Sequence, residues 1–182
     1  HMEPHYWESN SIEERIDVKE WSVKHEIDVA INFLRNKEGN YRDNDKPFSL
    51  FISHNPPHTP FWKVPDDYLE FYEDKDYKEL LNRDNVSLDG EGQEAKDVVK
   101  QYFAAITGID HQFGRLMETL ENEGLKENTI VVFTSDHGEL MGSQGLMHKG
   151  KCYNESMLVP FMIRWPENIL PEKDDLLLSV PD

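Results

Sequence analysis

Apolar residues recur at a spacing of three to four along two stretches of the chain, and this spacing predicts helices. One helix is predicted over residues 23–34 and a longer one over residues 94–123. Gly124 follows the longer stretch directly, where a glycine commonly ends a helix. The apolar positions of the first stretch are Val23, Ile27, Ala30, Ile31 and Leu34, and those of the second are Val98, Tyr102, Ala105, Ile109, Phe113, Leu116 and Leu120.

Three shorter stretches are continuous apolar runs rich in β-branched and aromatic residues, which is typical of buried strands. They cover residues 48–53, 129–135 and 159–164. Because the long helix lies between the first two runs, we expect a right-handed crossover and a parallel sheet. The pattern therefore predicts the α/β class.

Two other stretches are polar. Residues 1–22 form a polar, acidic arm, and its opening His1-Met2 is interpreted as a cloning remnant. Residues 55–92 form a long acidic excursion with few periodic apolar positions. Loops of this length in a compact domain are usually functional or disordered, so this excursion is either the wall of a substrate cleft or a solvated insertion.

The charge balance narrows the classes of partner. The 182 residues carry a formal net charge of -17, which argues against nucleic acid because its phosphates would be repelled. An anionic ligand would have to be held by local cations. No apolar run approaches the roughly 20 residues needed to span a membrane. The single cysteine, Cys152, excludes an internal disulfide framework.

Candidate chemistry begins where the second predicted strand ends. Ser135-Asp136-His137-Gly138 follows the apolar run Ile130 to Phe133, and a carboxylate beside an imidazole at the end of a buried strand can form half of a metal site. An isolated Asp-His-Gly is more often a polar strand-to-loop corner. The motifs on either side decide between these interpretations.

Several motifs in order resemble the sulfatases of the alkaline phosphatase superfamily, over residues 23–182. They are a strand followed by Pro57-His58-Thr59-Pro60, a long helix, a strand ending in Ser135-Asp136-His137-Gly138, the turn Lys149-Gly150-Lys151-Cys152-Tyr153, and a strand from Val159-Pro160 to Trp165-Pro166. Spaced motifs in the right order are far more specific than any one of them. The resemblance implies a doubly wound, mostly parallel sheet flanked by helices, of which residues 23–182 are the central part.

The resemblance also implies roles for individual residues. Asp136 and His137 would bind a divalent metal, which is calcium by family. Many relatives have asparagine where His137 stands, and an imidazole there makes manganese a second candidate. Lys149 would contact the sulfate oxygens, and His58 would donate a proton to the leaving oxygen. His148 is a weaker candidate for substrate binding because it directly precedes Lys149.

Part of the family's machinery is absent from these residues. The Cys- or Ser-x-Pro-x-Arg signature that yields the formylglycine nucleophile does not occur, since Cys152 is followed by Tyr153-Asn154-Glu155-Ser156. Neither Asp66-Asp67 nor Asp174-Asp175 follows an apolar strand, so neither resembles the family's metal-binding aspartate pair. We therefore expect a middle portion of a longer enzyme, inactive alone, with the missing N-terminal and C-terminal parts as its partners.

The expected substrate of the parent enzyme is a sulfate ester, with sulfated carbohydrates among the candidates. Two alternatives stay open: a phosphonate monoester hydrolase or phosphodiesterase of the same superfamily, and an acidic, non-catalytic metal-binding or interaction domain. The last predicts no convergence of His58, Asp136, His137 and Lys149. By family, the compartment would be periplasmic or extracellular. Removing neighbouring strands would favour self-association of this portion through exposed strand edges.

Overall fold

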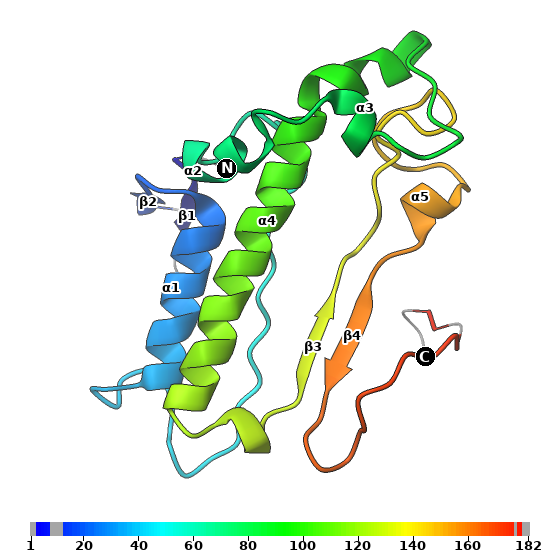
Figure 1. Cartoon of the computed structure of the whole chain (residues 1–182). Coiled ribbons are helices and arrows are strands. Elements are labelled where there is room, and N and C mark those ends of the chain that lie inside the picture. The colour runs from blue at the N-terminus through cyan, green and yellow to red at the C-terminus, as the bar shows by residue number, and fades with distance from the viewer. Residues whose placement is uncertain (1–2, 8–12, 177, 180–182) are drawn as a thin grey trace.

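The computed structural model describes residues 3–7, 13–176 and 178–179. Its longest element is α4 (Gln93–Asn122), which runs the length of the molecule (Figure 1). Helix α1 (Ser22–Arg35) lies along one side of α4, and the strands β3 (Val131–Thr134) and β4 (Phe161–Arg164) lie on the other.

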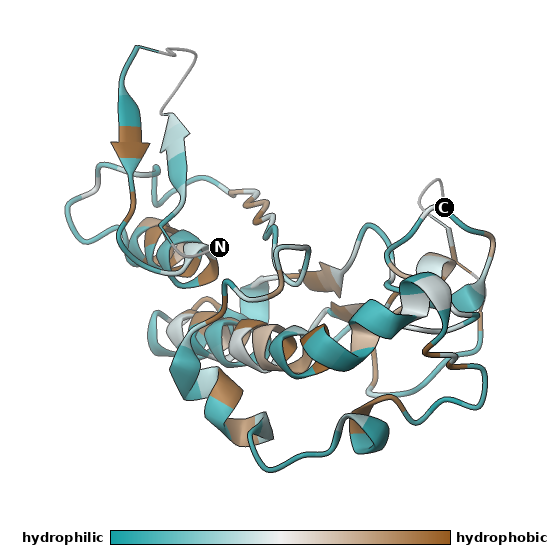
Figure 2. Ribbon diagram, turned by 90° about the horizontal axis from the view of Figure 1, so that it is seen from above, coloured by the Kyte–Doolittle hydropathy of each residue, from teal (hydrophilic) through white to brown (hydrophobic). Residues whose placement is uncertain are grey.

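The two predicted helices are confirmed, and their apolar faces form the main core. Ile27 and Leu34 of α1 are buried against Leu116 and Leu120 of α4. Burying one such side chain stabilises a fold by about 1.5–3 kcal/mol. Figure 2 shows polar and apolar residues mixed along both helices, as expected for elements with one face in the core and the other in water.

Helix α4 ends as its sequence predicts. Gly124 has a φ of +68°, a conformation that side chains disfavour, and its N–H donates to Glu121 O at 3.0 Å. The N–H of Leu125 donates to Leu120 O at 2.8 Å, so the last turn closes on itself. The chain can then turn back into β3.

The strand predicted over residues 48–53 is wrong, because this segment is extended but pairs with no strand among the described residues. Phe48 and Ile52 pack against the α1–α4 core, while the side chain of Phe51 is 91% exposed. The apolar pattern therefore predicted extension and burial correctly. A strand also needs a neighbouring backbone to bond, and the pattern of one segment does not contain that information.

The expected parallel sheet is likewise not formed within the described part of the chain. Strands β3 and β4 pair antiparallel, with Val131 opposite Arg164 and Thr134 opposite Phe161. The extended segment 48–53 does rise in the same direction as β3 in Figure 1, which is the direction that the crossover predicted.

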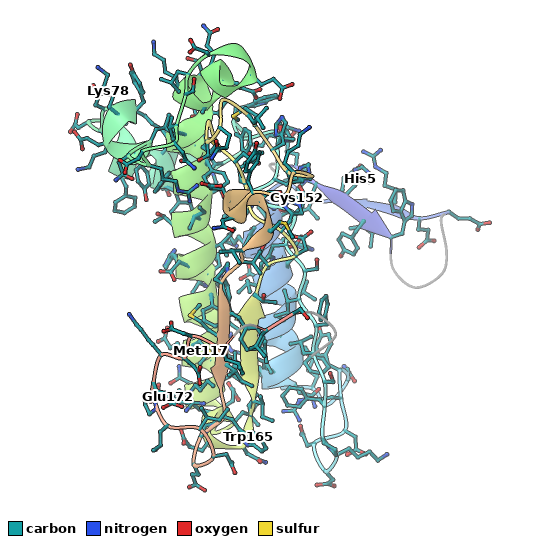
Figure 3. All side chains as sticks on the ribbon, turned by 90° about the vertical axis from the view of Figure 1, so that its right-hand side faces the viewer. His5, Lys78, Met117, Cys152, Trp165 and Glu172 are labelled. Carbon is teal, nitrogen blue, oxygen red and sulfur yellow. The ribbon has the colours of Figure 1, made fainter. Side chains whose placement is uncertain are left out.

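The polar N-terminal arm contains a hairpin rather than only irregular chain. Strands β1 (His5–Trp7) and β2 (Arg15–Asp17) pair antiparallel and project from the helical body (Figures 2 and 3). Residues 1–2 and 8–12 of the predicted arm, including His1-Met2, lie outside the described residues.

Within the acidic stretch 55–92, short helical segments pack against α4. The Tyr72 hydroxyl lies 2.6 Å from Thr107 Oγ1 of α4, so the stretch is tied to the long helix. The segments are α2 (Asp66–Leu69), η1 (Glu70–Tyr72), α3 (Tyr77–Leu80) and η2 (Gly90–Gly92), and further along the chain are η3 (Lys126–Asn128) and α5 (Asn154–Met157). Within the described residues, no helix combines the length and apolar character that a membrane span needs.

Candidate active site

Three loops that are far apart in sequence bring their polar side chains together. The Lys149 Nζ atom lies 2.5 Å from His58 Nε2, although the two residues are 91 positions apart. The His58 ring lies 6.4 Å from the His137 ring, between centroids, and meets it edge-on. His58, Lys149 and the strand-end residues Asp136 and His137 therefore share one site, as the sequence motifs led us to expect.

The hydrogen bonds of His58 determine where its proton lies. Its Nδ1 atom is 2.8 Å from the carbonyl oxygen of Thr59, and a carbonyl oxygen only accepts hydrogen bonds. Nδ1 therefore carries the proton, and Nε2 accepts from the ammonium group of Lys149. A proton is thus already held between Lys149 and the ring nitrogen that faces the site.

The His137 ring lies beside a carboxylate. Its Nδ1 is 2.8 Å from the Gly138 carbonyl oxygen, and its Nε2 is 3.6 Å from Asp136 Oδ2. Two ligand atoms bound to one ion at about 2.1–2.4 Å lie roughly 3.0–3.9 Å apart. This separation therefore fits two ligands of a shared metal ion.

These two residues can supply only part of a metal's coordination shell. In the described part of the chain, no group of three or more histidine, cysteine, aspartate or glutamate side chains is placed to hold an ion. The Asp136 side chain is 85% exposed, so its oxygens are open to an incoming ion. Asp136 and His137 alone would give an ion two of its ligands.

Close backbone packing holds the strand-end loop in place. The Gly138 N–H donates to Ser156 O of α5 at 2.9 Å, and a Cβ atom at Gly138 would lie 2.0 Å from Glu155 O. Only glycine permits this approach. The same helix binds the lysine loop, because the Gly150 N–H donates to Ser156 Oγ at 3.2 Å.

Glu155 fixes the other side of α5. Its Oε1 accepts from Asn85 Nδ2 at 2.5 Å, and this hydrogen bond lowers the pKa of Glu155. Glu155 therefore ties α5, which holds both loops, to Asn85. Cys152 is an exposed free thiol in the loop beside α5 (Figure 3).

His148 is placed differently from its neighbour Lys149. Its ring stacks on Phe61, with 6.3 Å between centroids and 14° between planes, and its Nδ1 lies 3.9 Å from Glu139 Oε2. Two other histidines bond elsewhere: His54 Nδ1 lies 2.5 Å from Glu26 Oε2 of α1, and His111 Nδ1 lies 2.8 Å from the Tyr68 hydroxyl.

Sequence reasoning missed Glu139 and Phe61. The Glu139 side chain is only 10% exposed, and burial together with the Glu139 carboxylate raises the pKa of Tyr102 on α4 to about 12, against an opposing effect of Arg83. An acidic residue between Gly138 and an apolar Leu140-Met141 pair was the available signal. Phe61 is 3% exposed and lies in the stretch 55–92, which we interpreted as a cleft wall or a solvated insertion.

Two hollows on the described surface lie away from this site. One, of about 540 Å³, is lined by residues that include Trp21, Tyr68 and His111. The other, of about 190 Å³, lies between α4 and the β3–β4 pair and is lined by residues that include Met117 and Ile163.

Comparisons with known proteins identify the family of the chain. A family model described as sulfatase matches residues 4–182. The chain is 44% identical over 186 residues to an endo-4-O-sulfatase of Bacteroides thetaiotaomicron, covering 100% of this chain and 35% of that protein. It is 37% identical over 176 residues to an arylsulfatase of Clostridium perfringens, covering 88% of this chain and 34% of that protein. The chain thus spans about a third of the length of these curated relatives.

A solved structure has a similar fold. A Bacteroides thetaiotaomicron protein described with the metabolism of multiple glycosaminoglycans superposes with a TM-score of 0.92 at 43% identity, covering 100% of this chain and 37% of that chain. This likeness confirms the α/β fold class predicted from the sequence.

Proposed function

Because the chain belongs to the sulfatase family, we propose that it supplies the sulfate-contacting and proton-donating side of a sulfuric ester hydrolase site, together with half of the metal site. The observation that carries this proposal is the 2.5 Å contact between Lys149 Nζ and His58 Nε2, beside Asp136 and His137. A non-catalytic acidic domain gives no reason for these four side chains to converge.

In this mechanism Lys149 binds the sulfate group. Its ammonium charge stabilises the negative charge that builds on the sulfate oxygens, and it does so locally in a chain whose net charge is -17. A bound sulfate would also draw the ammonium N–H groups away from His58, because an anionic oxygen is a stronger acceptor than a ring nitrogen.

His58 then acts on the leaving group. With the ammonium drawn away, Nε2 takes up a proton from water and donates it to the ester oxygen as the bond to sulfur breaks. An alcohol therefore leaves instead of an alkoxide, and the ring is left neutral with its proton on Nδ1. The hydrogen bond from Nδ1 to Thr59 O fixes the ring so that Nε2 continues to face the site.

Sulfatases generally use a divalent metal and a formylglycine nucleophile. When bound, the metal would polarise the sulfate oxygens, and Asp136 and His137 would hold it through Oδ2 and Nε2. Calcium is the ion that the family favours, and the imidazole of His137 makes manganese the second candidate.

For the ion, we predict weak binding by this chain alone, with a dissociation constant of about 1 mM or weaker, because two ligands leave most of the shell to water. Calorimetric titrations with Ca²⁺ and Mn²⁺ would measure this constant for the chain and for Asp136→Ala, with Asp43→Ala as an exposed control. Tight binding that survives Asp136→Ala would contradict the half-site.

The proposed substrate class is a sulfated carbohydrate. The support is the 44% identity to a protein described as an endo-4-O-sulfatase and the likeness to a structure described with glycosaminoglycan metabolism. A sulfate ester at a sugar 4-hydroxyl within a glycosaminoglycan chain is therefore the first substrate to test.

The test is sulfate release by the complete protein that carries this chain. Lys149→Ala and His58→Gln should each lower kcat by roughly 100- to 1,000-fold, the range typical of losing one transition-state stabilising or proton-donating group. Lys151→Ala, in the same loop, is the matched control and should stay near wild type. Full activity in the Lys149→Ala protein, or faster hydrolysis of phosphonate monoesters than of sulfate esters, would overturn the proposal.

A further inference from the structure

Glu139 is a largely buried carboxylate that the proposed chemistry does not use. It lies between the strand-end loop and the lysine loop, and its side chain is 10% exposed. Its Oε1 atom accepts the backbone N–H of His148 and that of Met141, the latter at 3.3 Å. One oxygen thus binds both ends of the segment 141–148.

Both of those backbone positions adopt unusual conformations. Met141 has a φ of +43° and His148 a φ of +64°, which residues with side chains rarely adopt. Such conformations persist only where the surroundings impose them. The shared hydrogen bonds to Glu139 Oε1 are the contact common to both positions, and Lys149 is the next residue after His148.

The His148 ring connects this segment to the loop that carries His58. It stacks on Phe61, which follows His58 by three residues and is buried. The Phe61 ring in turn lies 6.0 Å from the ring of Tyr102 on α4, at 79° between planes. Fixing the backbone of His148 therefore also fixes how the Lys149 and His58 loops lie against each other.

We propose that Glu139 is a positioning residue of this site: its carboxylate oxygen fixes the backbone at His148 and thereby holds Lys149 against His58. The inference rests on the proposed function and deepens it. In this arrangement the His148 ring, stacked on Phe61, sets the separation between the loop that carries Lys149 and the loop that carries His58.

Three substitutions separate the position of the acceptor from its charge. Glu139→Gln keeps an oxygen at the same reach and removes the charge. Glu139→Asp keeps the charge and withdraws the oxygen by one methylene. Glu139→Leu removes both at similar volume. Glu121→Leu is the control, because Glu121 is an exposed carboxylate of α4 whose ion-pair partner is Lys126.

The direct readout is the His148 amide in ¹H–¹⁵N spectra of the full 182-residue chain. We expect it to be shifted downfield and protected from exchange in the wild type and in Glu139→Gln. In Glu139→Asp and Glu139→Leu it should move upfield and exchange roughly 10- to 100-fold faster, as expected when a hydrogen bond to a charged acceptor is lost. Nuclear Overhauser effects between the Lys149 and His58 side chains should weaken in the same two variants.

Catalysis provides the second readout. In the complete protein, Glu139→Asp and Glu139→Leu should lower kcat by roughly 10- to 100-fold with a smaller change in KM, because a small misplacement of Lys149 affects the transition state most. Glu139→Gln should restore most of the rate. A merely structural residue would lower the amount of folded protein and leave kcat per folded molecule unchanged.

Each outcome decides the inference. An unchanged His148 amide in Glu139→Asp or Glu139→Leu would overturn it, and so would a loss in Glu139→Gln equal to that in Glu139→Leu. If Glu139→Leu does not fold, the comparison of Glu139→Gln with Glu139→Asp still tests the positioning role of Glu139. If Lys149→Ala keeps full sulfate release, the proposed function fails, while the His148 amide still reports on the positioning separately.

Discussion

At the scale of single residues, Gly138 sets how closely the strand-end loop approaches α5. A Cβ atom there would lie 2.0 Å from the backbone oxygen of Glu155, and backbone cannot move aside cheaply. We predict that Gly138→Ala lowers the free energy of unfolding by about 1–3 kcal/mol, as overpacking does. Urea denaturation followed by circular dichroism measures this change.

Gly114 supplies the control for that prediction. It lies in α4, and a Cβ atom added there would have no neighbouring atom within 4 Å, so Gly114→Ala should raise stability by about 0.5–1 kcal/mol. Equal effects of the two substitutions would contradict the packing explanation of Gly138.

The residues of the candidate site could be named from the sequence because each lies inside a short motif, and the order of the motifs led us to expect them at one site. Their individual contacts could not be predicted, since Lys149 and His58 are 91 positions apart and no local pattern relates them. The role of Glu139 was hidden for the same reason: its hydrogen bond to the His148 backbone depends on how two loops fold against each other.

At the scale of elements, an ion-pair network joins α1 to α4. Asp28 of α1 accepts from Arg115 of α4 at 2.6 Å and from Lys24 at 2.7 Å. Burial opposes the charge on Asp28, but these hydrogen bonds outweigh it and lower the pKa of Asp28 below its usual value of 3.8. The pairing therefore stabilises the fold fully above about pH 4 and is lost as the pH falls through the lowered pKa.

We accordingly predict that Asp28→Asn lowers the free energy of unfolding by about 1 kcal/mol at pH 7, a magnitude typical of partly exposed pairs. The difference from wild type should shrink as the pH falls below about 4 and disappear once the pH lies below the lowered pKa of Asp28. Denaturant titrations across this range measure it, with Asp43→Asn, whose partner Lys46 is exposed, as the control. A difference that grows on acidification would show the sign to be wrong.

The elements that could be predicted are those whose sequence signal lies within their own residues. The helices α1 and α4 follow from the spacing of their own apolar residues, including the end of α4 at Gly124. Strand pairing is not local: residues 48–53 are extended with Phe48 facing the core, yet they form no strand. The pairing direction of β3 with β4 also depends on the long connection between them.

At the scale of the whole molecule, apolar side chains on β3 and β4 are exposed. Val132, Phe161, Met162 and Ile163 are exposed, and Met162 and Ile163 also line the groove with Met117 of α4. A free strand edge and an uncovered apolar face are templates for association. The net charge of -17 opposes this contact at low ionic strength.

We therefore predict self-association of the chain that strengthens with added salt. Light scattering should show a rise in mean mass from low to high salt, and Met162→Glu should weaken association by roughly tenfold or more, since a charge would have to be buried. Ile106→Glu, at an exposed position of α4, is the control. A strict monomer at every salt concentration would contradict the prediction.

The central claim is that His58 and Lys149 act as one unit on a sulfate ester, and a double-mutant cycle tests it most directly. We would measure kcat/KM for sulfate release by the complete protein with His58→Gln, Lys149→Ala and both together. Because the two side chains lie 2.5 Å apart and act on the same ester group, the double variant should be about as slow as the slower single variant. Losses that multiply, as for two independent residues, would contradict the account.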